Sequence, residues 1–188
     1  MVLLWILGVE SLLAGLPVVM MLRDGVLDGS ASGAPALDLR EALGEAWLTA
    51  LGDFPQRTFP LSLAQVLLAS TLVLASTLVL IGRPSSRTFA LQAVAANAAF
   101  AVVQYILLRN VRAQWVDMAV RATAVFKDAS LPTEPDQLTR YYYWVHRSKL
   151  IVLELGIPFL AALALTRSRT KTYFAEAATA AEGAEEEP

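Results

Sequence analysis

The chain has 188 residues, of which 56% are apolar and 17% charged, and it contains no cysteine. A soluble domain usually has about a quarter charged residues, so this composition excludes an ordinary soluble globule and a disordered chain. Without cysteine, a disulfide scaffold and thiol chemistry within this chain are excluded, and the net charge of −2 indicates no nucleic-acid partner.

The apolar residues concentrate in four segments that are nearly free of charge and long enough for a hydrocarbon layer of roughly 30 Å. The sequence therefore predicts an all-α integral membrane protein whose four transmembrane helices cover residues 2–22, 61–81, 89–108 and 150–166. For the first segment the alternative is a secretory signal peptide. The segment lacks a basic region before Val2 and is longer than a usual signal-peptide core, so a span is favoured.

The connection between the first two spans contains a predicted amphipathic helix over residues 36–54, with Asp38 as its N-terminal cap. Its apolar residues recur at helical spacing on one face. They are Leu39, Leu43, Ala46, Trp47, Ala50 and Leu51.

The third span is rich in alanine, which favours close packing between helices in lipid. Nothing in the sequence breaks the helix after Leu108, so we expect it to continue as one helix to about residue 128. Its predicted apolar stripe consists of Val111, Trp115, Met118, Ala122 and Val125. Two prolines indicate a turn over 128–135, and a further helix over 134–149 continues into the fourth span.

These two long connections predict a helical extramembrane cap, formed by the connection between spans one and two and the connection between spans three and four. The alternative is a set of separate helices that lie on the membrane surface. Spans two and three are joined by only six residues, 82–87, so we expect a tight antiparallel hairpin. The tail, 167–188, begins basic and ends acidic, and it is predicted to be mobile.

Four spans place both termini on the same side of the membrane as the 82–87 connection. That side carries five basic residues in short segments, whereas the predicted cap carries ten basic residues in folded segments with ten acids. Counting basic residues alone favours a cytoplasmic cap, but folded segments cross membranes with less regard to charge. We therefore expect cytoplasmic termini in a bacterial inner (plasma) membrane.

A small set of polar residues lies within or near the predicted spans. Such residues are costly in lipid and usually face a bundle interior or a cavity. By depth they fall into two layers and form a candidate intramembrane site: Glu10, Asn97, Gln65, Gln104 and Glu154. One interpretation is a set of inter-helix hydrogen bonds, with Glu10 protonated or held by Asn97. The other is a path for protons or substrate, in which the pKa of a desolvated carboxyl is raised.

The single histidine, His146, is expected to belong to an aromatic belt with the neighbouring residues 141–144. One histidine cannot supply both axial ligands of a haem, so no metal and no cofactor are predicted. Five basic residues near this belt are candidates for contacts with lipid headgroups, or alternatively simple anchors: Arg109, Arg112, Arg140, Arg147 and Lys149.

The sequence contains none of the nucleotide-binding, zinc-protease or serine-hydrolase motifs. The predicted function is therefore a non-enzymatic subunit or scaffold component of a membrane assembly, in contact with membrane lipids and with a protein partner or a second copy. The alternative is a small proton-coupled transporter or lipid-handling protein that uses the carboxylates of Glu10 and Glu154. A membrane enzyme acting at the headgroup level through His146 is a third, weaker possibility.

Overall fold

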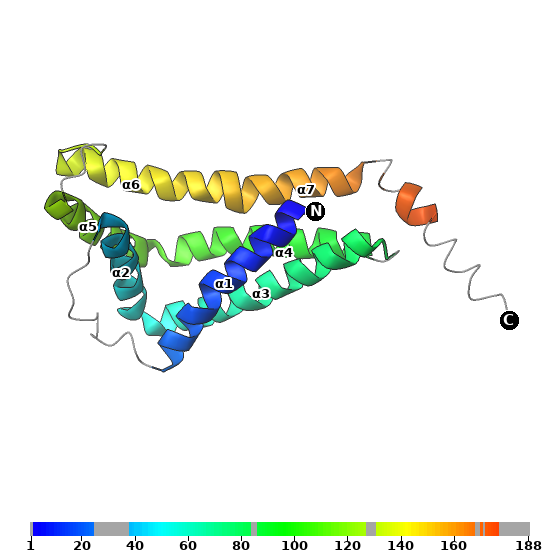
Figure 1. Ribbon diagram of the computed structural model, residues 1–188, viewed down its shortest axis with the longest axis horizontal. Helices are drawn as coiled ribbons and strands as arrows, with labels where there is room; N and C mark the ends of the chain where they lie inside the picture. Colours follow the sequence, from blue (N-terminus) through cyan, green and yellow to red (C-terminus); the bar gives the residue numbers. More distant parts are fainter. Residues whose placement is uncertain are drawn as a thin grey trace. The chain divides into compact units, whose positions relative to one another are not determined.

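The computed structural model describes residues 2–24, 38–83, 86–126, 131–167, 170 and 172–176. Every regular element in these ranges is a helix (Figure 1). In chain order they are α1 (Val2–Arg23), α2 (Leu39–Gly52), α3 (Pro55–Ile81), α4 (Ser86–Leu107), α5 (Arg109–Phe126), α6 (Pro135–Lys149), the π-helix η1 (Leu150–Gly156) and α7 (Ile157–Thr166).

Among the described residues, four helices are long and apolar enough to cross a membrane: α1, α3, α4 and the uninterrupted run Pro135–Thr166 that contains α6, η1 and α7. The prediction of an all-helical chain with four such helices is confirmed at this level.

The chain divides into two compact units. The first unit comprises Met1–Ala14, Ala64–Val102 and Ile151–Pro188, and the second comprises Gly15–Leu63 and Val103–Leu150. Several helices therefore contribute one end to each unit. The two units are described in turn.

The core of the first unit is built mostly from small and branched apolar side chains. They are Leu4, Leu72, Ala75, Ala90, Ala93, Val94, Ala161 and Leu165. Small side chains let helix backbones approach closely, which drives association where there is no water to exclude. Helices α1 and α3 approach closely at Gly8, where a Cβ atom would lie 2.8 Å from the Val73 side chain of α3.

The C-terminus of α3 ends in a tight glycine turn. Gly82 has a positive φ of 84°, its N–H donates to the Val79 carbonyl at 3.1 Å, and the Arg83 N–H donates to the Leu78 carbonyl at 3.2 Å. This is the Schellman pattern, which uses the left-handed conformation that glycine adopts without strain. Arg87, at the start of α4, donates from Nε to the Leu165 carbonyl at 2.8 Å and so caps the end of α7.

Between α6 and α7 the chain follows seven residues of π-helix instead of the continuous α-helix expected from the sequence. The local reason is Pro158, the second residue of α7. Proline has no N–H to donate to the carbonyl four residues earlier, and a wider turn accommodates that missing bond.

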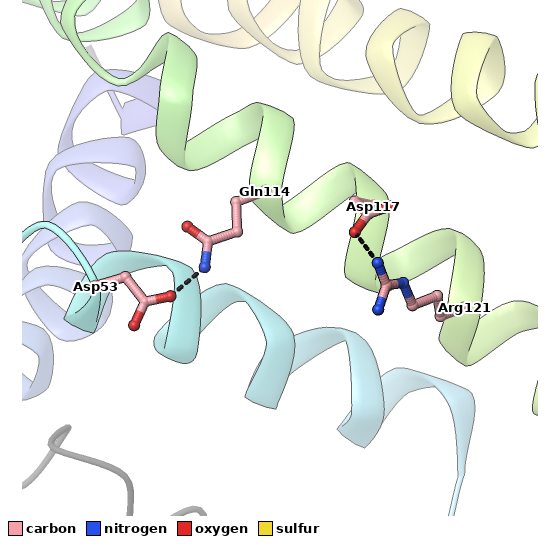
Figure 2. Close-up of polar contacts among 4 residues, drawn as sticks. All are labelled: Asp53, Gln114, Asp117 and Arg121. Carbon is pink, nitrogen blue, oxygen red and sulfur yellow. Dashed lines mark hydrogen bonds and ion pairs between the residues drawn. The ribbon is translucent and has the colours of Figure 1, made fainter.

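The second unit is built around the packing of α2 on α5 (Figure 1). Asp38 caps α2, as its sequence predicts, because its carboxylate accepts from the Glu41 N–H at 2.7 Å. At the other end of α2, Asp53 accepts a hydrogen bond from Gln114 of α5 (Figure 2). Between these points the core contains buried residues of α2, α5 and α6: Ala46, Ala50, Leu51, Val111, Trp115, Val116, Ala119, Leu138 and Tyr142.

The structure differs from the sequence expectation after the third candidate span. The expected single helix is divided at Leu108 into α4 and α5. At the division, the guanidinium of Arg112 donates to the Tyr105 carbonyl, which a continuous helix would use for the backbone N–H of residue 109. The buried face of α5 also includes Arg112 and Thr123, whereas Val125 of the predicted stripe is 76% exposed.

Parts of the sequence predictions fall outside the described residues. These are the start of the 36–54 helix, the first part of the 128–135 turn, and most of the 167–188 tail. Within the described part of the tail, residues 172–176 are helical and Phe174 is buried.

Candidate functional site

Glu10, the deepest carboxylate predicted in the membrane, lies on the exposed side of α1. Its neighbours at helical spacing are also exposed: Leu3 by 66%, Ile6 by 49% and Leu13 by 72%. The opposite side of the helix, with Leu4 and Gly8, packs into the first unit. In the described part of the chain, nothing forms a hydrogen bond or ion pair with the Glu10 carboxyl.

The Asn97 amide forms other hydrogen bonds than the predicted one with the Glu10 carboxyl. Its Nδ2 donates to the Ala93 carbonyl at 2.9 Å and to the Leu68 carbonyl of α3 at 3.2 Å. An amide group has two N–H hydrogens, so these two bonds use its donor capacity. Asn97 therefore joins α4 to α3 and has no N–H left for a carboxyl.

The remaining members of the predicted polar site are Gln65, Gln104 and Glu154, and Glu10 and Asn97 both belong to the first unit. Gln65 and Glu154 belong to the first unit and Gln104 to the second. All three are half-buried, and each takes part in an interaction within the described structure.

The five predicted headgroup contacts separate into two groups within the second unit. Arg109, Arg140, Arg147 and Lys149 are exposed, as anchors at a membrane surface would be. Arg112 is not, because only 9% of it is exposed.

Arg112 lies over the ring of Tyr105, with Cζ 3.7 Å from the ring centroid. One terminal nitrogen donates to the Tyr105 carbonyl, while Nε is buried and has no hydrogen-bond partner among the described residues. Burial lowers the pKa of the guanidinium from its ordinary value, although arginine remains protonated in proteins. Among the described residues, neither of the two ion pairs, Arg23–Asp24 and Arg121–Asp117, involves Arg112.

His146 packs against the aromatic core of the second unit. Its ring centroid is 4.5 Å from that of Trp115, with the rings at 82°, and 5.7 Å from that of Trp47. Its Nε2 is buried, and nothing in the part of the chain that the structure describes forms a hydrogen bond with it. The expectation of an aromatic belt did not foresee this packing. The signal in the sequence is the spacing Leu138, Tyr142, His146, which places the histidine on the buried face of α6.

The other polar groups of this core are paired. The Trp115 indole N–H donates to the Leu43 carbonyl at 3.0 Å, and the hydroxyls of Thr123 and Tyr142 lie 2.6 Å apart in a hydrogen bond. Buried polar groups in proteins are nearly always satisfied in this way. The unpaired nitrogens of Arg112 and His146 are therefore exceptions in an otherwise complete network.

The first unit contains an apolar pocket of about 580 Å³ between α4 and the η1–α7 segment, lined by residues such as Val94, Ala98, Leu155 and Phe159. Small residues on both sides, including Ala95 and Gly156, widen it. Because its lining is apolar, the pocket has room for hydrocarbon and no groups that would perform chemistry.

Among the residues that the structure describes, there is no group of three or more His, Cys, Asp or Glu side chains that could hold a metal ion. Comparison with models of known protein families, with curated proteins and with solved structures found no match.

Proposed function

We propose that this protein is a non-enzymatic subunit of a membrane assembly, in which the four apolar helices cross the bilayer and α1 binds a partner. Within the most apolar stretch of each of these helices, only 17–22% of the residues are buried inside the chain. In water this much exposed apolar surface would be very unfavourable, whereas hydrocarbon solvates it at no cost.

The second unit supplies the helical cap of this proposal. The run Pro135–Thr166 has 32 residues, or roughly 48 Å at 1.5 Å per residue, which exceeds a hydrocarbon layer of roughly 30 Å. The surface of α5 carries charged groups that suit water, including the exposed ion pair between Arg121 and Asp117 at 2.6 Å (Figure 2). We place the cap outside a bacterial inner membrane and the termini in the cytoplasm.

The observation that carries the proposal is the exposed position of Glu10. A carboxyl in the hydrocarbon region is expensive, and such groups almost always face a bundle interior or pair with another polar group. Asn97 has no N–H left for the Glu10 carboxyl. Ile6 and Leu13, which neighbour Glu10 on α1, are exposed on the same side of the helix. A helix from a partner protein or a second copy would cover this side and provide the missing hydrogen bond.

The same position argues against an internal proton path as the main function. A carboxylate that relays protons through the chain would face the interior of the bundle. We therefore give the subunit hypothesis priority over the proton-coupled alternative.

The experiment uses the natural absence of cysteine. Leu13→Cys places a thiol on the side of α1 that carries Glu10, and Leu67→Cys, at a 60% exposed position of α3, is the matched control. Oxidation in native membranes should cross-link Leu13→Cys to a second copy, or mass spectrometry should find a stoichiometric partner. Leu67→Cys should cross-link much less.

Glu10 variants then test the chemistry of the contact. Glu10→Gln should keep the association, because it preserves shape and hydrogen bonding. Glu10→Leu should weaken it about threefold or more, since an inter-helix hydrogen bond in lipid is worth about 0.6 kcal/mol on average. A protein that stays monomeric and without a partner in native membranes would contradict the proposal.

A further inference from the structure

The apolar pocket of the first unit lies along one face of α4 and the neighbouring η1–α7 segment. On α4 its lining residues are Leu91, Val94, Ala95 and Ala98, which share one face of the helix by their spacing. Its volume of about 580 Å³ falls within the range of sites that hold small molecules, roughly 300–1,000 Å³. All of its lining residues belong to the first unit, so the pocket is a property of that unit alone.

The pocket is open at the surface of the unit. Ile151 and Phe159 line it and are exposed, whereas Val94 and Pro158, also in its lining, are buried. An exposed apolar hollow of this kind is a typical binding surface. Where α4 and α7 cross a bilayer, its opening meets the hydrocarbon chains of lipids.

Two arginines lie at one end of this pocket. Arg87 precedes Leu91 by four residues, about one turn of α4, and Arg167 follows Ala162 by five residues, directly after the end of α7. The Arg87 Nε donates to the Leu165 carbonyl at 2.8 Å, which joins the start of α4 to the end of α7. Both cations are therefore next to the same end of the pocket.

The charge of these arginines is not balanced by the residues that the structure describes. Neither Arg87 nor Arg167 takes part in an ion pair with them. Glu176, the described carboxylate nearest to Arg167 in sequence, is exposed and pairs with neither. Of the five N–H donors of Arg87, only the one on Nε has an acceptor in the described part of the chain. Its two terminal nitrogens remain for an anion, and their planar fork matches the geometry of phosphate.

The position of the pocket along α4 matches one half of a bilayer. Its lining begins four residues and ends eleven residues after Arg87, which is roughly 6–16 Å at 1.5 Å per residue. Half of a hydrocarbon layer of roughly 30 Å is about 15 Å. A phospholipid whose phosphate lies at the level of the arginines would therefore have its acyl chain at the depth of the pocket.

We propose that the pocket binds one acyl chain of an anionic phospholipid, whose phosphate accepts hydrogen bonds from Arg87 and is attracted by Arg167. The two charges favour this occupant over a partner's apolar helix, which would fill the pocket but leave the arginines unbalanced. They also favour a headgroup with a net negative charge over a zwitterionic one. The inference rests on the membrane crossings of the proposed function, but not on Glu10 or on a protein partner.

The test uses the full chain in phosphatidylcholine nanodiscs that contain a small fraction of phosphatidylglycerol with a photoreactive diazirine in one acyl chain. After illumination, mass spectrometry maps the cross-linked residues. Phosphatidylcholine with the same photoreactive chain is the control for the headgroup. The phosphatidylglycerol probe should cross-link mainly to the pocket lining in α4 and the η1–α7 segment, and the phosphatidylcholine probe about fivefold less or lower still.

Two adjacent alanines of α4 give a matched pair of variants for the acyl chain. Ala95 and Ala96 are both exposed, but of the two only Ala95 lines the pocket. Ala95→Phe should fill the pocket and remove most of the cross-links from its lining. Ala96→Phe adds the same ring outside the pocket and should leave the cross-links unchanged.

A second pair of variants tests the headgroup. Arg87→Gln should lower cross-linking by the phosphatidylglycerol probe about fivefold, the effect of one basic residue near an anionic membrane surface. Arg109→Gln removes an exposed cation beyond the other end of α4 and should leave the yield unchanged. Arg167→Gln, at an exposed position, keeps the experiment decisive if Arg87→Gln does not fold.

Equal cross-linking of the pocket by the two probes, or by Ala95→Phe and Ala96→Phe, would overturn the proposal, because the pocket would then contact only bulk lipid. A Phe159→Cys chain that forms a disulfide with another protein chain in native membranes would also overturn it, since a partner helix would then cover the pocket. A chain that binds the lipid but stays monomeric and without a partner would contradict the subunit function and leave this site intact. The two proposals can therefore fail separately.

Discussion

Gly8 and Gly44 are both helical glycines, but their surroundings differ. A Cβ atom at position 8 would come within 2.8 Å of the Val73 side chain and 3.3 Å of the Ala69 carbonyl, whereas at position 44 it would meet nothing within 4 Å. The first glycine lets α1 approach α3, and the second, in α2, has no such role.

We therefore expect opposite effects from the same substitution. Gly8→Ala overpacks the α1–α3 contact and should destabilise the protein by about 1–3 kcal/mol. Gly44→Ala should stabilise it by about 0.5–1 kcal/mol, because alanine is the better helix former. Thermal unfolding of the full chain in detergent, followed by circular dichroism, checks both. Equal effects of the two substitutions would show that α1 does not pack on α3 through Gly8.

At the scale of the elements, one threonine joins two helices of the second unit. Thr58 of α3 is fully buried, and its hydroxyl donates to the Leu51 carbonyl at 3.0 Å and the Phe54 carbonyl at 2.9 Å, at the end of α2. Thr49 is the natural comparison, since it is exposed and bonds only within its own helix to the Glu45 carbonyl.

Thr58→Val preserves shape but leaves buried carbonyls without that donor. Thr58→Val should lower the free energy of unfolding by about 1–3 kcal/mol, whereas Thr49→Val should change it by less than about 0.5 kcal/mol. Unfolding midpoints measured under identical detergent conditions provide the comparison. A Thr58→Val protein as stable as the parent would mean that the α2–α3 junction does not rest on this hydroxyl.

The elements also show which features the sequence makes predictable. The four long apolar helices and the Asp38 cap follow from local composition and periodicity, because each signal lies within its own helix. The division at Leu108 depends on where the Arg112 side chain donates, and the direction of Glu10 depends on which face of α1 meets α3. Such tertiary contacts are not encoded in hydropathy.

The candidate site was predictable only in part for the same reason. The sequence predicts Arg112 as a headgroup contact, but residue type alone does not distinguish its burial from the exposure of Arg109. The composition of residues 141–144 predicts that His146 belongs to an aromatic belt, whereas the spacing from Tyr142 places it in the aromatic core.

At the scale of the whole molecule, the proposed topology has four membrane crossings with both long connections on one side. Arg83 follows α3, Thr133 precedes α6, and Thr49 lies in α2, and all three are exposed. If α3 and α4 each cross the bilayer, the first of these positions must lie on the opposite side from the other two.

Single cysteines at these positions, labelled with a membrane-impermeant maleimide in sealed vesicles of known orientation, test this most directly, because the parent chain has no thiol of its own. The proposed topology predicts that Arg83→Cys labels from the cytoplasmic side and that Thr133→Cys and Thr49→Cys label from the other side. If Arg83→Cys labelled from the other side and Thr133→Cys and Thr49→Cys from the cytoplasmic side, the four-span topology would stand and only the orientation would be reversed. Labelling of Arg83→Cys and Thr133→Cys from the same side would contradict the four-span topology.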